Sequence, residues 1–338
     1  MNILIIGGTR FIGPHVVRRL LDAGHEVTRF HRGQTQLGPR EGVACIHGDR
    51  KDLDQFKAEF ERLAPDVVLD TMLYTEQQAR DLLRVFKGLT GRLVALSSSD
   101  VYRSYERVRG LAKAPPDNAP ASEDSPLREH LYPARADGQS PEDLHYNYEK
   151  ILVERVLMSE PQSLPATILR LPAVYGPGDY QHRLFPYLKR MDDGRPAILL
   201  EEGQDEWRWT RGYVENVADA IALAVNREET ANRLYNVGEA DALSEKEWVR
   251  EIGRLAGWTG EILVLPPEHL PPQMRSGLAF EHHLLTDTHR IREELGYTER
   301  VERGEALRRT IEWERANPPA EINPEEFDYQ AEDALLKE

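Results

Sequence analysis

The first 33 residues change their hydrophobic periodicity three times and define one structural unit. Residues 2–6 are a continuous apolar run that breaks at Gly7 and Gly8, which is typical of a buried parallel strand reaching its turn. Apolar residues then recur at helical spacing from Phe11 until Gly24, a usual helix stop. Residues 26–31 follow as a second strand. The pattern predicts a strand, a glycine turn, a helix and a strand.

The same alternation continues along the chain. Predicted strands cover residues 43–47, 67–70, 92–96, 166–171, 197–200 and 234–237. Predicted helices cover residues 52–63, 75–86, 141–159, 184–191, 216–225, 245–256, 289–295 and 304–314. Capping signals are Asp52 with Gln55, Ser140 before Pro141, and Ser244 with Glu247. Strands that alternate with helices predict an α/β fold, a Rossmann-type doubly wound parallel sheet with ligands at the carboxyl ends of its strands.

Two long segments interrupt this alternation. Residues 102–139 are polar and rich in proline, and they are too long for a routine connection, which favours a functional flap or a mobile loop. The acidic tail, residues 317–338, is expected to pack loosely or to be disordered. We expect residues 1–178 plus about 213–240 to bind a dinucleotide, and about 179–212 plus 241–316 to form a smaller C-terminal α/β substrate lobe.

Composition and charge narrow the class of protein. The 338 residues are 40% hydrophobic and 30% charged, and no apolar run approaches the roughly 18 residues of a membrane span. The chain begins directly with a strand pattern, so we expect a cytoplasmic protein without a membrane partner. The formal charge of −15 disfavours nucleic acid as a general partner.

Cys45 is the only cysteine of the chain. It excludes an internal disulfide and a cysteine cluster for a metal, and no metal site is expected. Its apolar context predicts an inert thiol in the core.

The glycine turn carries the first candidate chemistry. Gly7 and Gly13 match the outer glycines of the pattern G-x-x-G-x-x-G, with Arg10 at the middle position. Glycines let the backbone approach a pyrophosphate closely, while the first amides and the dipole of the helix favour its negative charge. The turn therefore predicts a dinucleotide site.

Tyr146 and Lys150 form a Y-x-x-x-K pair on the helix predicted over residues 141–159. Residues four apart emerge on one helix face, and an ammonium group beside a phenol lowers the pKa of the phenol, which makes it a useful base. A serine hydroxyl from residues 97–99, at the end of a predicted strand, can donate to a substrate oxygen.

These motifs occur in an order that resembles a known family. The segments are GGTRFIG (7–13), SSSDVY (97–102), YNYEK (146–150), LRLPAVYGPGD (169–179), RGYVENVADAI (211–221) and ELGY (294–297). Together they resemble an extended short-chain dehydrogenase/reductase of the NAD(P)-dependent epimerase/dehydratase group, over residues 1–316.

The resemblance implies a role for particular residues. Tyr146 would be the acid/base, Ser98 the catalytic hydroxyl, and Lys150 would also bind the nicotinamide ribose. The implied contacts of the dinucleotide are Gly7, Thr9, Arg10, Phe11, Ile12 and Gly13 at the diphosphate, Asp49 and Arg50 at the adenine, and Pro172 and Val174 at the nicotinamide. The implied substrate contacts are Asp100, Tyr175 and either Arg208 or Arg211. The resemblance also implies a homodimer, formed by the helices at residues 75–86 and 141–159.

The end of the second strand bears on the choice of cofactor. An NAD site usually has a carboxylate there, which accepts from the ribose 2′-hydroxyl and would repel a 2′-phosphate. This chain has His31 and Arg32, and Arg10 stands on the neighbouring turn. Two guanidinium groups favour NADP over NAD.

Several functions remain open. The leading one is an oxidoreductase or epimerase that acts on a sugar, in particular a sugar nucleotide, through Tyr-Lys-Ser chemistry. Ser99 and Asp100 stand where the dehydratases of the group carry two acids, which disfavours dehydration. The alternatives are an NADPH-dependent carbonyl reductase, an RNA-binding relative similar to plastid stem-loop binding proteins, and a non-catalytic dinucleotide sensor. No motif specifies the sugar.

Overall fold

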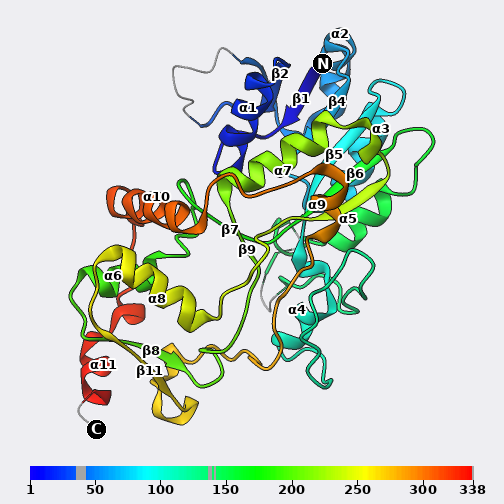
Figure 1. The fold of residues 1–338 in the computed structure, drawn as a ribbon. Helices are drawn as coiled ribbons and strands as arrows, with labels where there is room; N and C mark the ends of the chain where they lie inside the picture. The colour runs from blue at the N-terminus through cyan, green and yellow to red at the C-terminus, as the bar shows by residue number, and fades with distance from the viewer. Residues whose placement is uncertain (36–42, 136–138, 141, 337–338) are drawn as a thin grey trace.

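A seven-stranded parallel sheet forms the centre of the protein in a computed structural model that describes residues 1–35, 43–135, 139–140 and 142–336 (Figure 1). The order of its strands is β10-β6-β5-β4-β1-β2-β3, with every neighbouring pair parallel. The strands are β1 (Asn2–Ile6), β2 (Glu26–His31), β3 (Ala44–His47), β4 (Val67–Asp70), β5 (Arg92–Ser98), β6 (Ala166–Leu171) and β10 (Arg233–Asn236). This topology confirms the predicted Rossmann-type sheet.

Helices cover both faces of the sheet because the side chains of a strand point alternately to opposite sides. On one face lie α1 (Ile12–Asp22) and α7 (Val214–Asn226), whose apolar residues pack with Ile3 and Ile5 of β1. On the other lie α2 (Lys57–Leu63), α3 (Glu76–Phe86) and α5 (Lys150–Leu157), which pack with Leu4 and Ile6. Both core layers therefore share the same central strand.

A second group of elements lies away from this sheet, toward the C-terminus in Figure 1. It contains the parallel pair β8 (Ala197–Glu201) and β11 (Glu261–Leu265), with α6 (Phe185–Asp192), α8 (Glu245–Ala256), α10 (Arg303–Ala316) and α11 (Tyr329–Leu335). Between the groups, β7 (Ala173–Tyr175) pairs with β9 (Arg211–Tyr213). The remaining elements are α4 (Arg103–Val108), α9 (His289–Leu295) and the 3-10 helices η1 (Arg50–Phe56), η2 (Ser99–Val101), η3 (Glu228–Thr230), η4 (Pro267–His269), η5 (Pro272–Met274) and η6 (Pro324–Phe327). The sequence pattern missed β7 and β9, which have only three residues each, and also β11, α4 and α11.

The predicted helix caps have different outcomes. Ser244 and Glu247 form the expected capping box, in which each backbone N–H donates to the side chain of the other residue. Asp52 does not cap a helix, because its backbone is non-helical inside η1, and Asp49 accepts from the Lys51 N–H at 2.9 Å instead. The helix predicted over residues 52–63 is thus a 3-10 turn followed by the short α2.

The helix predicted over residues 141–159 begins nine residues later than expected. Residues 142–147 form turns and a bend, and Pro141 lies outside the described residues. Glu149 has an extended backbone, and its carboxylate accepts from the Ile151 N–H at 2.8 Å, so Glu149 caps α5. The same carboxylate forms a buried bidentate ion pair with Arg128, at 2.7 and 2.9 Å. This pairing places the first turn of α5 at Lys150.

The end of the C-terminal tail packs against the second group of elements as α11, whereas most of residues 317–326 are exposed, so the expectation of loose packing is wrong for the end of the tail only. Glu332 on α11 is 2% exposed, and its carboxylate lies 2.9 Å from the Arg190 Nε and 3.4 Å from the Arg195 Nε. Phe327 covers the Arg190 guanidinium at 4.8 Å. The carboxylate of Glu332 therefore holds the end of the acidic tail against Arg190.

The helices expected to form a dimer use most of their apolar residues within the chain. The buried ones are Ala79, Leu82, Val85 and Phe86 on α3 and Ile151, Val153, Val156 and Leu157 on α5. Leu83 and Leu152 are only half-buried. The homodimer stays a prediction with little apolar surface left for it on these two helices.

Among the helices of the described residues, none combines the length and the apolar character that crossing a bilayer requires.

Replacement of Glu332 tests the anchoring of the tail. We expect Glu332→Ala to lower the free energy of unfolding by about 3 kcal/mol, because it leaves the buried guanidinium group of Arg190 without its carboxylate, whereas Arg195 keeps its ion pair with Asp333. Urea denaturation followed by circular dichroism measures the effect. Glu325→Ala, on the exposed side of the tail, is the control and should change stability by less than about 0.5 kcal/mol. Equal stability of the two variants would show that the tail adds nothing to the fold.

Candidate active site

The glycine turn between β1 and α1 has a geometry that only glycines allow. Gly7 and Gly8 have φ values of 89° and 71°, in the left-handed region. A Cβ atom on Gly13 would lie 2.4 Å from the carbonyl carbon of Gly8, so α1 can begin directly against the turn only without a side chain there. No side chain of the described residues caps α1. The Gly13 N–H donates to the Arg10 carbonyl at 2.9 Å and Pro14 has no N–H, so of the first amides those of Phe11 and Ile12 remain available to an anion.

A cavity of about 1200 Å³ opens in front of this turn, at the carboxyl ends of β1, β2 and β4. It lies where the strand order reverses between β1 and β4, the usual ligand crevice of doubly wound sheets. Ten of the predicted cofactor contacts line it: Gly7, Thr9, Arg10, Phe11, Ile12, Gly13, His31, Arg32, Asp49 and Arg50. The glycine turn, Arg10 and Arg32, and the residues assigned to the adenine thus line the same cavity.

Lys150 lies behind the wall of this cavity. Its Nζ donates to the carbonyl oxygens of Leu73 at 2.6 Å and Leu96 at 2.9 Å, and Leu96 lines the cavity. The Nζ also lies 4.7 Å from the centre of the Tyr74 ring. Burial lowers the pKa of Lys150 to about 8, although nearby carboxylates, Asp100 first, oppose the shift. A buried ammonium group of this kind is held between the ends of β4 and β5.

The structure does not bring Tyr146 onto one helix face with Lys150. Tyr146 lies in the turns before α5, where Arg135 stacks 4.3 Å from the centre of its ring and donates to its carbonyl oxygen at 2.8 Å. Tyr146 and Lys150 are four residues apart but do not share a helix face, because α5 begins only at Lys150, after its cap Glu149.

Tyr148 occupies a position that the sequence pattern did not single out. Its ring centre lies 5.8 Å from the Lys150 Nζ, and its hydroxyl donates to the Asp100 Oδ2 at 2.7 Å. Burial first, and then the charge of Asp100, raise the pKa of Tyr148 well above its ordinary value. The phenol of Tyr148 is thus a proton donor in this arrangement. The second tyrosine of Y-N-Y-E-K was the signal available in the sequence.

Ser98 and Asp100 lie together at the end of β5. The Ser98 Oγ accepts from the Asp100 N–H at 3.2 Å and so caps η2. Burial raises the pKa of Asp100, and within the described residues its Oδ1 has no hydrogen-bond partner. A buried carboxyl group with one free oxygen can exchange a proton with a neighbour.

The residues expected around the nicotinamide and the substrate are more enclosed. Pro172 is half-buried, Val174 is buried, and the Tyr175 hydroxyl donates to Glu239 at 2.9 Å. Arg211 is held by Glu245 at 2.5 Å and stacks 4.3 Å from Trp248.

Arg208 is the more available of the two candidate arginines. Its side chain is 38% exposed, with one nitrogen donating to the Ala242 carbonyl at 2.7 Å. Its freedom to reach a solvent-borne ligand is therefore greater than that of Arg211.

The sheet, the glycine turn and the cavity define a dinucleotide-binding protein of the Rossmann class. More specifically, the chain belongs to the NAD dependent epimerase/dehydratase family, whose model matches residues 3–238. This match confirms the resemblance and the expected class of enzyme.

Individual relatives are distant. The chain is 26% identical over 250 residues to the chloroplast stem-loop binding protein of 41 kDa b from Arabidopsis thaliana, with 70% of this chain and 58% of that protein covered. It is 24% identical over 331 residues to a UDP-N-acetyl-alpha-D-glucosaminuronate decarboxylase from Bacillus cytotoxicus, with 92% and 97% covered. The structure of the Thermus thermophilus UDP-glucose 4-epimerase with NAD superposes with a TM-score of 0.66 at 21% identity, with 94% and 100% covered. The chain therefore spans less than two thirds of the chloroplast protein but nearly all of the other two.

The pKa of Lys150 predicts a pH dependence of stability in the cofactor-free protein. An unfolded lysine keeps its proton up to about pH 10.5, whereas the folded protein releases it near pH 8. Between these values the unfolded state binds more protons, so stability rises with pH. We expect wild type to gain about 1.5 kcal/mol relative to Lys150→Met between about pH 8 and about pH 9.5. Urea denaturation of both proteins measures this difference, and a constant difference would show that Lys150 is not a titrating buried cation.

Proposed function

We propose that the protein is an NAD(P)-dependent oxidoreductase or epimerase that acts on a hydroxyl-bearing or keto carbon of a sugar nucleotide. The observation that carries this proposal is the buried Lys150, which contacts the wall of a cavity lined by the glycine turn. Two of the relatives are named for UDP-sugars and cover almost the whole chain, which supports the substrate class.

The residues of the turn fit a dinucleotide. A Cβ atom on Gly7 would lie 2.6 Å from both the Met72 Cγ and the Thr71 Oγ1, so only a glycine lets the turn pack this closely against the segment after β4. The amides of Phe11 and Ile12, at the beginning of α1, are placed to receive a diphosphate. A bound nicotinamide dinucleotide would supply the acceptor and donor of hydride. The chain's own residues then have to orient the substrate and move the proton.

We assign the proton transfer to Tyr146, Lys150 and Ser98. Tyr146 takes the hydroxyl proton of the substrate, Lys150 stabilises the phenolate by its positive charge, and the Ser98 hydroxyl donates to the substrate oxygen. For this, the backbone of residues 146–149 has to wind into one further turn of α5, which would bring Tyr146 to the face of Lys150.

Tyr148 is a second candidate for the proton-transfer residue, and its contacts support it directly. Its hydroxyl already lies 2.7 Å from Asp100, and its ring lies near the Lys150 ammonium group. With a raised pKa it would act as a proton donor in the direction of reduction. Of the two, only Tyr148 needs no change at the start of α5.

Asp100 favours epimerase or reductase chemistry over dehydration. It is the single acid in the segment after Ser98, next to Ser99, and it is engaged by Tyr148. A dehydratase needs one group to remove a proton and another to protonate the leaving hydroxyl. With one acid in this segment, dehydration is disfavoured. The alternative to an epimerase at the same site is an NADPH-dependent carbonyl reductase.

We further propose the arrangement of the domains and of the assembly. Residues 1–178 plus about 213–240 would hold the dinucleotide, and about 179–212 plus 241–316, with Arg208, would hold the substrate. We also propose that the protein forms a homodimer and that it works in the cytoplasm.

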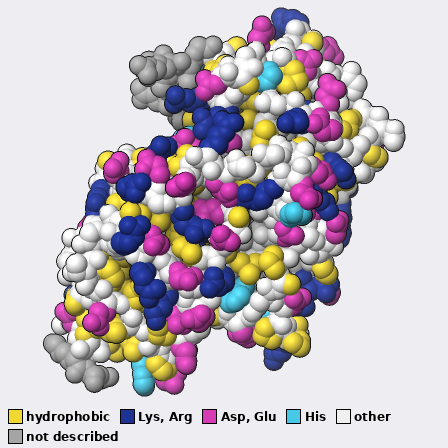
Figure 2. Space-filling view, viewed as in Figure 1, with side chains coloured by type: hydrophobic (Ala, Val, Ile, Leu, Met, Phe, Trp, Pro, Cys, Tyr) yellow, Lys and Arg dark blue, Asp and Glu magenta, His cyan; other side chains and the backbone are white. Residues whose placement is uncertain are grey.

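RNA binding is a second candidate function because the chloroplast relative is named for binding a stem-loop. The formal charge of −15 opposes it. Figure 2 shows acidic and basic side chains interspersed over the face in view, without one broad basic surface. We therefore place the enzyme first, with RNA binding and non-catalytic dinucleotide sensing as alternatives.

Two tyrosine variants test the proton-transfer assignment. We expect Tyr146→Phe to lower kcat by about 10²–10⁴ with any sugar nucleotide that wild type turns over, because it removes the acid/base oxygen alone. Cofactor affinity, measured by calorimetry, should stay within about twofold. A large loss in Tyr148→Phe with near-normal activity in Tyr146→Phe would transfer the role to Tyr148.

A cofactor titration tests the preference for NADP. Arg10 and Arg32 both line the cavity and are exposed, so their guanidinium groups can meet a 2′-phosphate. We expect NADP to bind more tightly than NAD, and Arg10→Ala and Arg32→Ala each to weaken NADP binding about tenfold while changing NAD binding by less than about twofold. Arg18→Ala, on the exposed side of α1, is the matched control. Equal or tighter binding of NAD by wild type would contradict the proposed preference.

A further inference from the structure

Cys45 is exposed, so the expectation of an inert core thiol is wrong. The reason is that β3 is the edge strand of the sheet, and apolar neighbours in the sequence do not cover both of its faces. Cys45 and His47 are two residues apart on β3 and therefore point to the same face. The thiol and the imidazole form a pair of potential ligands on an accessible edge.

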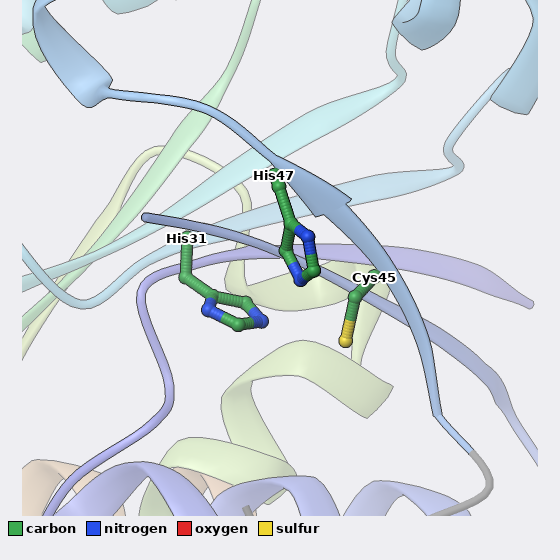
Figure 3. Close-up of side chains that lie close together, drawn as sticks. All are labelled: His31, Cys45 and His47. Carbon is green, nitrogen blue, oxygen red and sulfur yellow. The ribbon is translucent and has the colours of Figure 1, made fainter. Parts of the chain in front are cut away.

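His31 completes a cluster with these two side chains. It lies on β2 directly opposite His47 in the parallel register. One nitrogen or sulfur atom from each of His31, Cys45 and His47 lies within 4.8 Å of the other two. Figure 3 shows a ring nitrogen of His31 and a ring nitrogen of His47 directed toward the space beside the Cys45 sulfur.

The hydrogen bonding of His31 shows which tautomer its neutral ring adopts without an ion. Its Nδ1 accepts from the Gly33 N–H at 3.1 Å, which fixes the orientation of the ring. Its Nε2 is buried and has no hydrogen-bond partner among the described residues, and the whole residue is only 9% exposed. Because Nδ1 accepts here, the neutral ring carries its proton on Nε2, and a metal ion can bind Nε2 only when this proton moves to Nδ1 and the bond from the Gly33 N–H is given up. A buried ring nitrogen without a partner is costly, and ligation in this tautomer would remove that cost.

We propose that His31, Cys45 and His47 bind a divalent transition-metal ion of the zinc class. Two imidazoles and one thiolate suit zinc, which is usually bound by four ligands at about 2.0–2.3 Å, so that ligand atoms stand roughly 3.5 Å apart. Both Cys45 and His47 are exposed at the sheet edge, so binding would require their side chains to rotate toward His31, and the Cys45 Sγ would leave the Val43 carbonyl oxygen to which it donates at 3.6 Å. A water molecule would take the fourth position.

The charges around the cluster are compatible with such an ion. Arg29 is buried two residues before His31 on β2, and hence on the same face, so its charge opposes a cation. The negative charge of the Cys45 thiolate offsets it. Because His31 also lines the large cavity, a bound ion would add positive charge to that wall.

Zinc binding by the tag-free full-length protein tests this site. Isothermal titration with zinc chloride in a non-chelating buffer should give one ion per chain. Cys45→Ser and His47→Ala should each weaken binding by more than about tenfold, since even the outer-shell partners of metal ligands contribute about that much. His269→Ala, at an exposed histidine of η4, is the matched control and should bind as wild type does.

The single cysteine gives a second measurement that does not depend on the histidine variants alone. One equivalent of zinc should slow alkylation of Cys45 by iodoacetamide about tenfold, and a chelator should restore the rate. The protection should be lost in His47→Ala and kept in His269→Ala. Circular dichroism checks that each variant is folded.

Cobalt(II) in place of zinc should give a thiolate-to-metal absorption band that is absent in Cys45→Ser. No stoichiometric binding by wild type would overturn the proposal. So would zinc binding that is unchanged in both Cys45→Ser and His47→Ala, because the ion would then lie elsewhere.

Discussion

The buried ion pair between Arg128 and Glu149 determines much of the arrangement around the candidate active site. Glu149 uses its carboxylate for two tasks, since it pairs with Arg128 and also caps α5. Arg128 in turn donates to the carbonyl oxygen of Asp100 at 3.0 Å, so the pair ties the segment after β5 to the helix that carries Lys150. Both side chains are at most 1% exposed, and a pair so deeply buried holds its geometry because loss of either partner leaves a charge without compensation. The start of α5, and with it the tyrosine that lies beside Lys150, follows from this contact.

The hydrogen bonds of Lys150 also depend on where α5 begins. Its ammonium group is satisfied by two backbone carbonyls, from the ends of β4 and β5, which a helix starting elsewhere could not meet. These bonds replace water for a charge that burial otherwise destabilises, and the pKa is lowered nonetheless. A nearby negative or polar ligand group would add the stabilisation that the carbonyls do not supply. The enzyme proposal and the stability of this region therefore involve the same buried cation.

The sequence predicted what local pattern and backbone chemistry control. Strands β1, β2 and β6 and helix α9 begin and end where the apolar runs, glycines and caps indicated, because their side chains are buried in an unbroken period. The position of the glycine turn between β1 and α1 was predictable for the same reason. The start of α5 was not, since Arg128 lies 21 residues before Glu149 and no local pattern joins them. The anchoring of α11 by Arg190 likewise crosses 142 residues. Tertiary ion pairs of this kind override a local cap such as Ser140.

The exposure of Cys45 was likewise not predictable from local pattern, because it follows from the place of β3 at the edge of the sheet. In the interior of the sheet, a Cys-x-His pattern would direct both side chains into a packed layer with no room for an ion. On β3 the same two residues meet solvent, while their neighbour on β2, His31, is buried among the residues at the end of that strand. One fixed, buried ligand and two adjustable, exposed ones combine preorganisation with access, which an ion-binding site needs. The departure from a carboxylate at the end of β2 thus has two consequences: it removes a group that would repel a 2′-phosphate, and it supplies the one ligand of the cluster that cannot move away.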